Sequence, residues 1–109
     1  MNIIFTRPLI EAEDLMTSFF SSNYKVIHLP TLSITAAKME PLNTNDFDGL
    51  IFTSANAVRF LKLKNDEKNI KCFCVGNITE RSLRLKGFSN TVAASGTVMA
   101  LKNIILNSD

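Results

Sequence analysis

The feature of this sequence that most constrains its fold is a repeated alternation between short apolar runs and segments with helical spacing. Apolar runs rich in β-branched and aromatic residues, typical of buried strands, occur at residues 2–6, 24–29, 49–53, 70–75 and 91–94. A helix-like segment follows the first, third, fourth and fifth runs. Strands that alternate with single helices form parallel sheets, so the pattern predicts an α/β protein with a flavodoxin-like, doubly wound parallel sheet of about five strands.

Proline, glycine and capping residues predict where these elements begin and end. Pro8 suits the first turn of a helix that should end near Ser22, and Ser54 is placed to cap a second helix. Gly87 should end a third helix, and the last should cover residues 98–106. Apolar residues with helical spacing mark the face of the first helix, Ile10, Leu15, Phe19 and Phe20, and the inner face of the second, Ala55, Val58, Phe60 and Leu61. Ile78, Leu83 and Leu85 support a third helix.

The length of 109 residues suits one domain, covering residues 1–109. Within it we expect an opening strand-helix-strand unit at 1–29, a connector at 30–47 and the remaining strand-helix units at 48–109. The connector has no helical period and contains two prolines, which indicates an extended segment. A short strand at residues 32–34 is one option within it.

Composition and charge exclude several classes of function. With 12 basic and 10 acidic residues, the chain carries a net charge of +2, too balanced for a nucleic-acid or membrane surface. The sequence has neither an apolar stretch long enough for a membrane span nor a leader pattern, so we expect it in the cytoplasm. Cys72 and Cys74 lie two apart in an apolar run, so a strand would place both on one face as reduced core residues.

In open α/β sheets, ligands bind at the carboxyl ends of the strands, beside the amino ends of helices. Residues 6–7, 53–56, 76–79 and 95–97 should meet at that edge. They are hydroxylated, amide-bearing or glycine residues with one arginine and without a carboxylate, a set that suits an anionic ligand. Helix caps and turns need the same residue types, whereas Arg7 has less structural reason to lie near a helix start. Phosphate-loop, dinucleotide and nucleophile-elbow patterns do not occur, and the lone His28 is interpreted as a structural or edge residue.

Several segments together resemble the uroporphyrinogen-III synthase family. They are Thr6-Arg7-Pro8, the run Asp48-Gly49-Leu50-Ile51-Phe52-Thr53-Ser54-Ala55-Asn56-Ala57-Val58, the run Val75-Gly76-Asn77-Ile78-Thr79-Glu80, and Ser95-Gly96-Thr97. The resemblance implies an enzyme of tetrapyrrole and heme biosynthesis, a lyase that closes hydroxymethylbilane to uroporphyrinogen III with inversion of the last pyrrole ring. It implies that no metal or organic cofactor is used. The contacts it implies for the polycarboxylate substrate are Arg7, Thr53, Ser54, Asn56, Thr79, Ser95 and Thr97.

The sequence also departs from the family pattern. Family enzymes have two similar flavodoxin-like domains with the substrate between them, and this chain supplies the elements of one. A homodimer is therefore expected, either of closed domains or with opening units exchanged through the connector, residues 31–40; a complex with a second polypeptide is the other option. The tyrosine proposed to assist loss of the substrate hydroxyl is matched here by Leu32, and Tyr24 does not fit the motif, so no catalytic residue is assigned. The alternatives are a non-enzymatic tetrapyrrole- or polycarboxylate-binding module and an inactive half-domain.

Overall fold

The computed structural model describes residues 1–108, without the side chains of Ile10 and Glu11. The expected inward position of Ile10 and the last residue of the expected domain, Asp109, therefore lie outside the described part. The chain divides into two compact units, Met1–Ala36 and Ala37–Asp109, called here the opening unit and the main unit. Each is described by itself.

The opening unit is one parallel strand-helix-strand motif. Strand β1 (Asn2–Phe5) pairs in parallel with β2 (Lys25–His28), and α1 (Leu9–Ser21) connects them. The ring of Phe19 on α1 lies 5.9 Å from that of Phe5 and 5.3 Å from that of Tyr24. Helix α1 therefore covers the sheet face that carries Phe5.

The buried stripe of α1 is narrower than the sequence suggests. Ala12 is 2% exposed, whereas the predicted inward residues Leu15 and Phe20 are 56% and 71% exposed. Those two predictions are wrong for this unit, because a two-stranded sheet is too narrow to cover a wide helix face. The predicted end of the helix is confirmed: α1 ends at Ser21, and Asn23 follows with a φ of 66°.

The segment between β2 and β3 has little regular secondary structure. Residues 31–40 are all exposed and form no strand, so the optional strand at 32–34 is absent from this described segment. A short 3-10 helix, Thr44–Asp46, follows. Just before it, Leu42 bridges to the segment after α2, where its N–H donates to Lys62 O at 2.8 Å and its carbonyl accepts from Lys64 N at 2.7 Å.

The main unit contains one parallel sheet in the order β3-β4-β5. Its elements are β3 (Gly49–Phe52), α2 (Ala55–Phe60), β4 (Lys71–Val75), α3 (Asn77–Leu85), β5 (Thr91–Ala94) and α4 (Val98–Leu106). With the opening unit, the described residues give five strands and four helices, and all strand pairs are parallel. The α/β class with a flavodoxin-like pattern is confirmed, with the strands hydrogen-bonded as two sheets.

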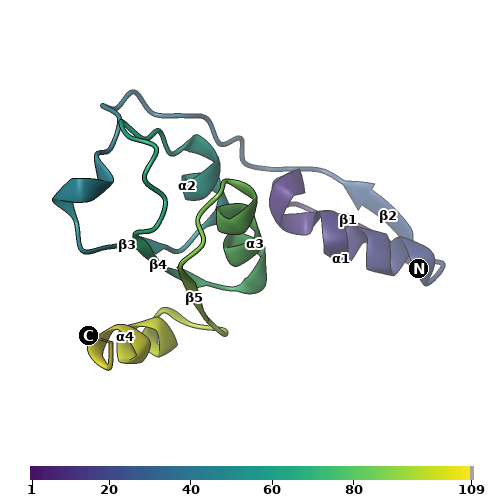
Figure 1. Ribbon diagram of the computed structural model, residues 1–109. Helices are drawn as coiled ribbons and strands as arrows, with labels where there is room; N and C mark the ends of the chain where they lie inside the picture. Colours follow the sequence, from purple (N-terminus) through teal and green to yellow (C-terminus); the bar gives the residue numbers. More distant parts are fainter. Residues whose placement is uncertain (109) are drawn as a thin grey trace. The chain divides into compact units, whose positions relative to one another are not determined.

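Within the main unit, α2 and α3 lie on one side of the sheet and α4 lies on the other (Figure 1). Alternation along the strands divides the core between these two faces. Cys72 and Cys74 pack with α2 and α3 on one face, whereas Phe73 packs with Leu101 of α4 on the other. Helices thus cover both faces, as the doubly wound prediction requires. Both cysteines are free and completely buried on one face, as expected.

Leu83 and Leu85 both lie in α3, as expected. Residues two apart on a helix cannot share a face, so Leu83 is fully buried while Leu85 is 83% exposed. Helix α2 ends at Phe60, and its last carbonyls are bound by Lys86: the Lys86 ammonium donates to Val58 O at 2.8 Å and to Leu61 O at 2.6 Å. Among residues 1–108, each helix is too short or too polar to cross a membrane.

Candidate functional site

Three loops of the main unit leave the carboxyl ends of its parallel strands. These loops, together with the first turns of α2 and α3, are called here the carboxyl rim: residues 53–56 after β3, 76–79 after β4 and 95–97 after β5. Because the three strands are parallel neighbours, these loops lie at one edge of the sheet. Each loop leads directly into a helix, so the rim presents the amino ends of α2, α3 and α4.

Two hydroxyl groups of the rim act as helix caps. Ser54 Oγ accepts a hydrogen bond from the N–H of Asn56 at 3.1 Å, and Thr97 Oγ1 accepts one from the N–H of Ala100 at 3.3 Å. In both cases the hydroxyl uses its acceptor capacity, so its own O–H can still donate. A structural role as a cap is therefore compatible with donation to an anion.

The rim glycines are required for their backbone conformation. Gly76 and Gly96 both have a φ of 86°, a left-handed conformation that favours glycine. A Cβ atom added to either would meet nothing within 4 Å, so lack of space does not explain the glycine. These two residues set the course of the backbone into α3 and α4. Both glycines were expected at this edge, but their conformational role was not; a glycine just before a predicted helix is the signal that could have indicated it.

The predicted contact residues of the main unit differ in accessibility. Thr53, Ser95 and Thr97 are exposed, and Ser54 is partly exposed. Asn56 and Thr79 are each only 5% exposed and lie on the first turns of α2 and α3. Four of the six predicted residues thus offer surface to a ligand, whereas these two offer little.

Arg7, the seventh predicted contact, belongs to the opening unit and is not grouped with the other six by this structure. It is exposed and lies just after β1. Hydrogen bonds hold the backbone here: His28 Nε2 lies 2.8 Å from the carbonyl oxygen of Arg7, and Thr31 N donates to Thr6 O at 3.0 Å. His28 therefore contributes to the shape of the loop that carries Arg7, which fits its interpretation as a structural or edge residue.

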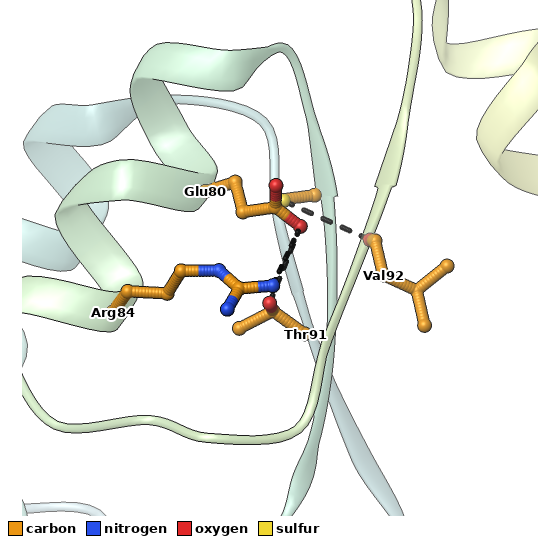
Figure 2. A network of polar contacts seen from close by, with 5 residues as sticks. Glu80, Arg84, Thr91 and Val92 are labelled. Atoms are coloured by element: carbon orange, nitrogen blue, oxygen red, sulfur yellow. Dashed lines mark hydrogen bonds and ion pairs between the residues drawn. The ribbon is translucent and has the colours of Figure 1, made fainter.

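The carboxylate that follows the rim in sequence is turned away from it. Figure 2 shows the Glu80 side chain directed toward Thr91 and Arg84. Glu80 Oε2 accepts from Thr91 Oγ1 at 3.2 Å and lies 3.8 Å from the Arg84 guanidinium. Thr91 is the first residue of β5, at the end of the strand opposite the rim. This arrangement directs the negative charge of Glu80 toward Thr91 and Arg84.

The two thiols of the main unit are unsuited to nucleophilic chemistry. Burial, together with the neighbouring Cys74, raises the pKa of Cys72 to about 11, and burial and then the Glu80 carboxylate raise the pKa of Cys74. Both side chains have hydrogen-bond partners in the strands: Cys72 Sγ lies 3.5 Å from Ile70 O and Cys74 Sγ lies 3.7 Å from Val92 O. A buried, protonated thiol is a core residue rather than a reactive group.

Comparison with known proteins gives one match. The family model described as uroporphyrinogen-III synthase HemD matches residues 14–109. Neither a curated protein nor a solved structure matches the chain. The matched range includes the whole of the main unit and most of α1.

Proposed function

This chain belongs to the uroporphyrinogen-III synthase family, and from this membership we propose that it takes part in the closure of hydroxymethylbilane to uroporphyrinogen III, with inversion of the last pyrrole ring. The family implies a tetrapyrrole substrate. The observation that supports a substrate-binding role is the carboxyl rim, where three helix amino ends and several hydroxyl groups occur without a carboxylate. Such a surface favours the carboxylates of the linear tetrapyrrole.

We assign the substrate contacts on this surface by the donors that each residue offers. Thr53, Ser54, Ser95 and Thr97 donate hydroxyl hydrogens to substrate carboxylates. Asn56 and Thr79, each 5% exposed on the first turns of α2 and α3, are the least direct contacts in this proposal. Arg7 adds a guanidinium that can hold a carboxylate through two parallel hydrogen bonds.

The catalytic contribution of these residues is to hold the flexible substrate in a folded, reactive shape. Fixing the two ends of a linear molecule near each other removes the entropy cost of ring closure, a large part of the barrier. Backbone amides and hydroxyls preorganised at the rim stabilise negative charge without moving during the reaction. Specific proton donors are not assigned, and the chemistry requires no metal or organic cofactor under this proposal.

One main unit provides one wall of a site, so we propose that the active form is a homodimer. Exchange of opening units through the exposed segment 31–40 would join two rims in one particle. We place this activity in the cytoplasm, where the two free cysteines stay reduced.

The direct test is incubation of the purified protein with hydroxymethylbilane, followed by oxidation and chromatographic separation of the porphyrin isomers. We expect the type III isomer above the level of a reaction without protein. If only the spontaneous type I product appears at every protein concentration, the enzymatic proposal is wrong. Calorimetry with uroporphyrinogen would then decide between a binding module, which releases or absorbs heat at up to millimolar ligand, and an inactive half-domain, which does not.

A matched pair of charge variants tests the role of the rim itself. Ser95→Asp adds a carboxylate at the rim end of β5, and Ser89→Asp adds the same charge before the opposite end of that strand. We expect Ser95→Asp to raise KM about tenfold or more through repulsion of the substrate carboxylates, and Ser89→Asp to change it less than about twofold. The difference should shrink at high salt. Equal effects of the two variants would contradict binding at the rim.

A further inference from the structure

The turn that ends α3, residues 86–88, lies against the end of strand β3 and is called here the α3 turn. Gly87 has a φ of 106°, a left-handed conformation that lets the chain leave the helix axis. The next residue, Phe88, is 1% exposed, and its ring lies 6.5 Å from that of Phe52, the last residue of β3. The rim segment 53–56 begins directly after that residue, so the α3 turn supports the point at which the segment leaves the sheet.

Lys86, the first residue of the α3 turn, binds the helix that follows the rim segment. Its ammonium donates to Val58 O at 2.8 Å and to Leu61 O at 2.6 Å. Helix α2 has six residues and is followed by Leu61 in an extended conformation, so it lacks the left-handed glycine that commonly satisfies the last carbonyls of a helix. Lys86 satisfies these carbonyls instead and places a positive charge at the negative end of the helix.

A second lysine fixes the position of Lys86. The Lys86 carbonyl accepts a hydrogen bond from the Lys68 ammonium at 2.8 Å, and a Cβ atom added to Gly87 would meet Lys68 Cδ at 3.1 Å. Burial, and then the charge of Lys68, lowers the pKa of Lys86. An ammonium in such surroundings is costly unless its hydrogen bonds are made, so the two carbonyls at the end of α2 hold it in one place.

These contacts leave the rim segment 53–56 between two supports that come from the same turn. The end of β3 packs on Phe88, and the last turn of α2 is bound by Lys86. A segment this short between two fixed ends has few alternative backbone shapes. It carries Thr53 and Ser54, two of the proposed hydroxyl donors. Donors that are already in place lose little entropy when they bind a carboxylate.

We propose that Lys86 is a positioning residue for substrate binding, and that its hydrogen bonds to α2 hold the rim segment 53–56 in the shape that receives a substrate carboxylate. The inference rests on the proposed function, which places substrate carboxylates at this segment. Lys86 is not itself a substrate contact, because its ammonium is bound at the carboxyl end of α2 and the rim lies at the amino end. Loss of these two hydrogen bonds lets the short helix move and leaves every proposed contact residue in the chain.

Three variants test this role by NMR relaxation, without substrate. Lys86→Met keeps an unbranched side chain and removes its donors, whereas Lys86→Arg keeps a charged donor. Lys102→Met removes the same charge from an exposed position on α4. In Lys86→Met, the order parameters of the amides at 54–56 should fall from about 0.85 toward 0.6, and those of β4 should stay unchanged. Lys86→Arg should restore most of the order, and Lys102→Met should match the wild type. Circular dichroism checks that each variant is folded under these conditions.

Steady-state kinetics separates positioning from a purely structural role. Reduced stability alone lowers the fraction of folded enzyme, so the apparent kcat falls while KM stays unchanged. We expect Lys86→Met to raise KM about tenfold and to change kcat less than about twofold, and Lys86→Arg to recover most of this loss. Lys102→Met should stay within about twofold of the wild type in both constants.

Two results would overturn the inference: an unchanged KM in Lys86→Met, or order parameters at 54–56 that match those of the wild type. Failure of the proposed function has a different signature, because the wild-type chain would then form no type III isomer. In that case the relaxation data still decide whether Lys86 holds the segment.

Discussion

The opening unit and the main unit contain the same kind of motif and differ sharply in how much core they bury. In the part of the chain that the structure describes, the opening unit has one buried apolar residue, Ala12. The main unit has two apolar clusters, one on each side of its sheet, with Leu83, Phe88 and Leu101 almost completely buried. Apolar burial is the dominant favourable term in folding, so the stability of this chain must be concentrated in the main unit.

The opening unit therefore has little core of its own to hold it folded. It spans Met1–Ala36, a length at which a chain rarely folds alone without a disulfide, a metal or association. Its main internal packing is the aromatic group of Phe5, Phe19 and Tyr24. Several of its apolar side chains, among them Leu15 and Phe20, are more than half exposed. The comparison can be tested by substitutions that weaken one unit at a time.

The largest effect should come from the core of the main unit. Phe88 is 1% exposed and its ring lies 6.5 Å from that of Phe52, so Phe88→Ala removes a large buried ring and leaves a cavity. We expect the free energy of unfolding, measured with urea, to fall by about 3–5 kcal/mol. Leu85→Ala, at an exposed position on α3, should change it by less than about 0.5 kcal/mol. If Phe88→Ala lowers the free energy of unfolding no more than Leu85→Ala does, the stability of the chain is not concentrated in the main unit.

A somewhat smaller loss of stability is expected at alkaline pH, and it too should arise in the main unit. The folded state raises the pKa of Cys72 from 9.0 to about 11 through burial, with a smaller contribution from Cys74. Above pH 9 the unfolded chain ionises this thiol while the folded chain does not, so stability is full below pH 9 and falls up to about pH 11. Two pH units at about 1.4 kcal/mol each give a loss of roughly 3 kcal/mol.

Urea unfolding at pH 8 and pH 10.5 checks this loss, with Cys72→Ala as the comparison. The variant is less stable overall because it leaves a small cavity, yet its stability should depend less on pH than that of the wild type. An equal pH dependence in both proteins would show that Cys72 does not ionise on unfolding. Both thiols are buried in the native protein, so at pH 8 they should react with a thiol reagent only as fast as the main unit transiently unfolds around them.

The sequence predicted the elements well because their signals are local. The strand at 91–94 and the helix at 98–106 have the predicted bounds, and Gly87, with a φ of 106°, follows α3 as expected. Long-range partners were not predictable in the same way. Lys86 binds the end of α2 across 25 and 28 residues of sequence, a contact that no local pattern signals. The division of five strands into two hydrogen-bonded sheets likewise depends on contacts beyond the reach of periodicity.

The candidate site was only partly predictable for a related reason. Capping residues such as Ser54 and Thr97 are recognisable from the sequence, and both cap helices as expected of their types. The depth of a side chain is a property of packing, and the sequence alone did not separate exposed Thr53 from Asn56, which is 5% exposed. Whether any of these residues contacts a ligand stays a prediction that the charge variants address.

A third and more local effect is expected in the opening unit. Phe19→Ala removes the ring that contacts both Phe5 and Tyr24, so the strands of this unit should lose about 2 kcal/mol of local stability. Hydrogen exchange should accelerate about 30-fold at the paired amides of β1 and β2 and stay unchanged in β4. The exposed Phe20, 71% accessible on the same helix, gives the matched control Phe20→Ala. Acceleration throughout the main unit would mean that the two units unfold as one.

The smallest effects come from one substitution made in both units, for which we expect opposite signs. Thr97 caps α4 through a hydrogen bond from Ala100 N at 3.3 Å, so Thr97→Ala should cost the main unit about 1 kcal/mol. Thr17 lies inside α1, exposed, and its hydroxyl bonds only to the carbonyl of Glu13 one turn earlier. Thr17→Ala replaces a poor helix former and should stabilise α1 by about 0.5 kcal/mol. Thr97→Ser keeps the hydroxyl, so its stability in thermal unfolding should be close to that of the wild type. If Thr97→Ser loses as much stability as Thr97→Ala, the methyl group of Thr97 rather than its cap is responsible.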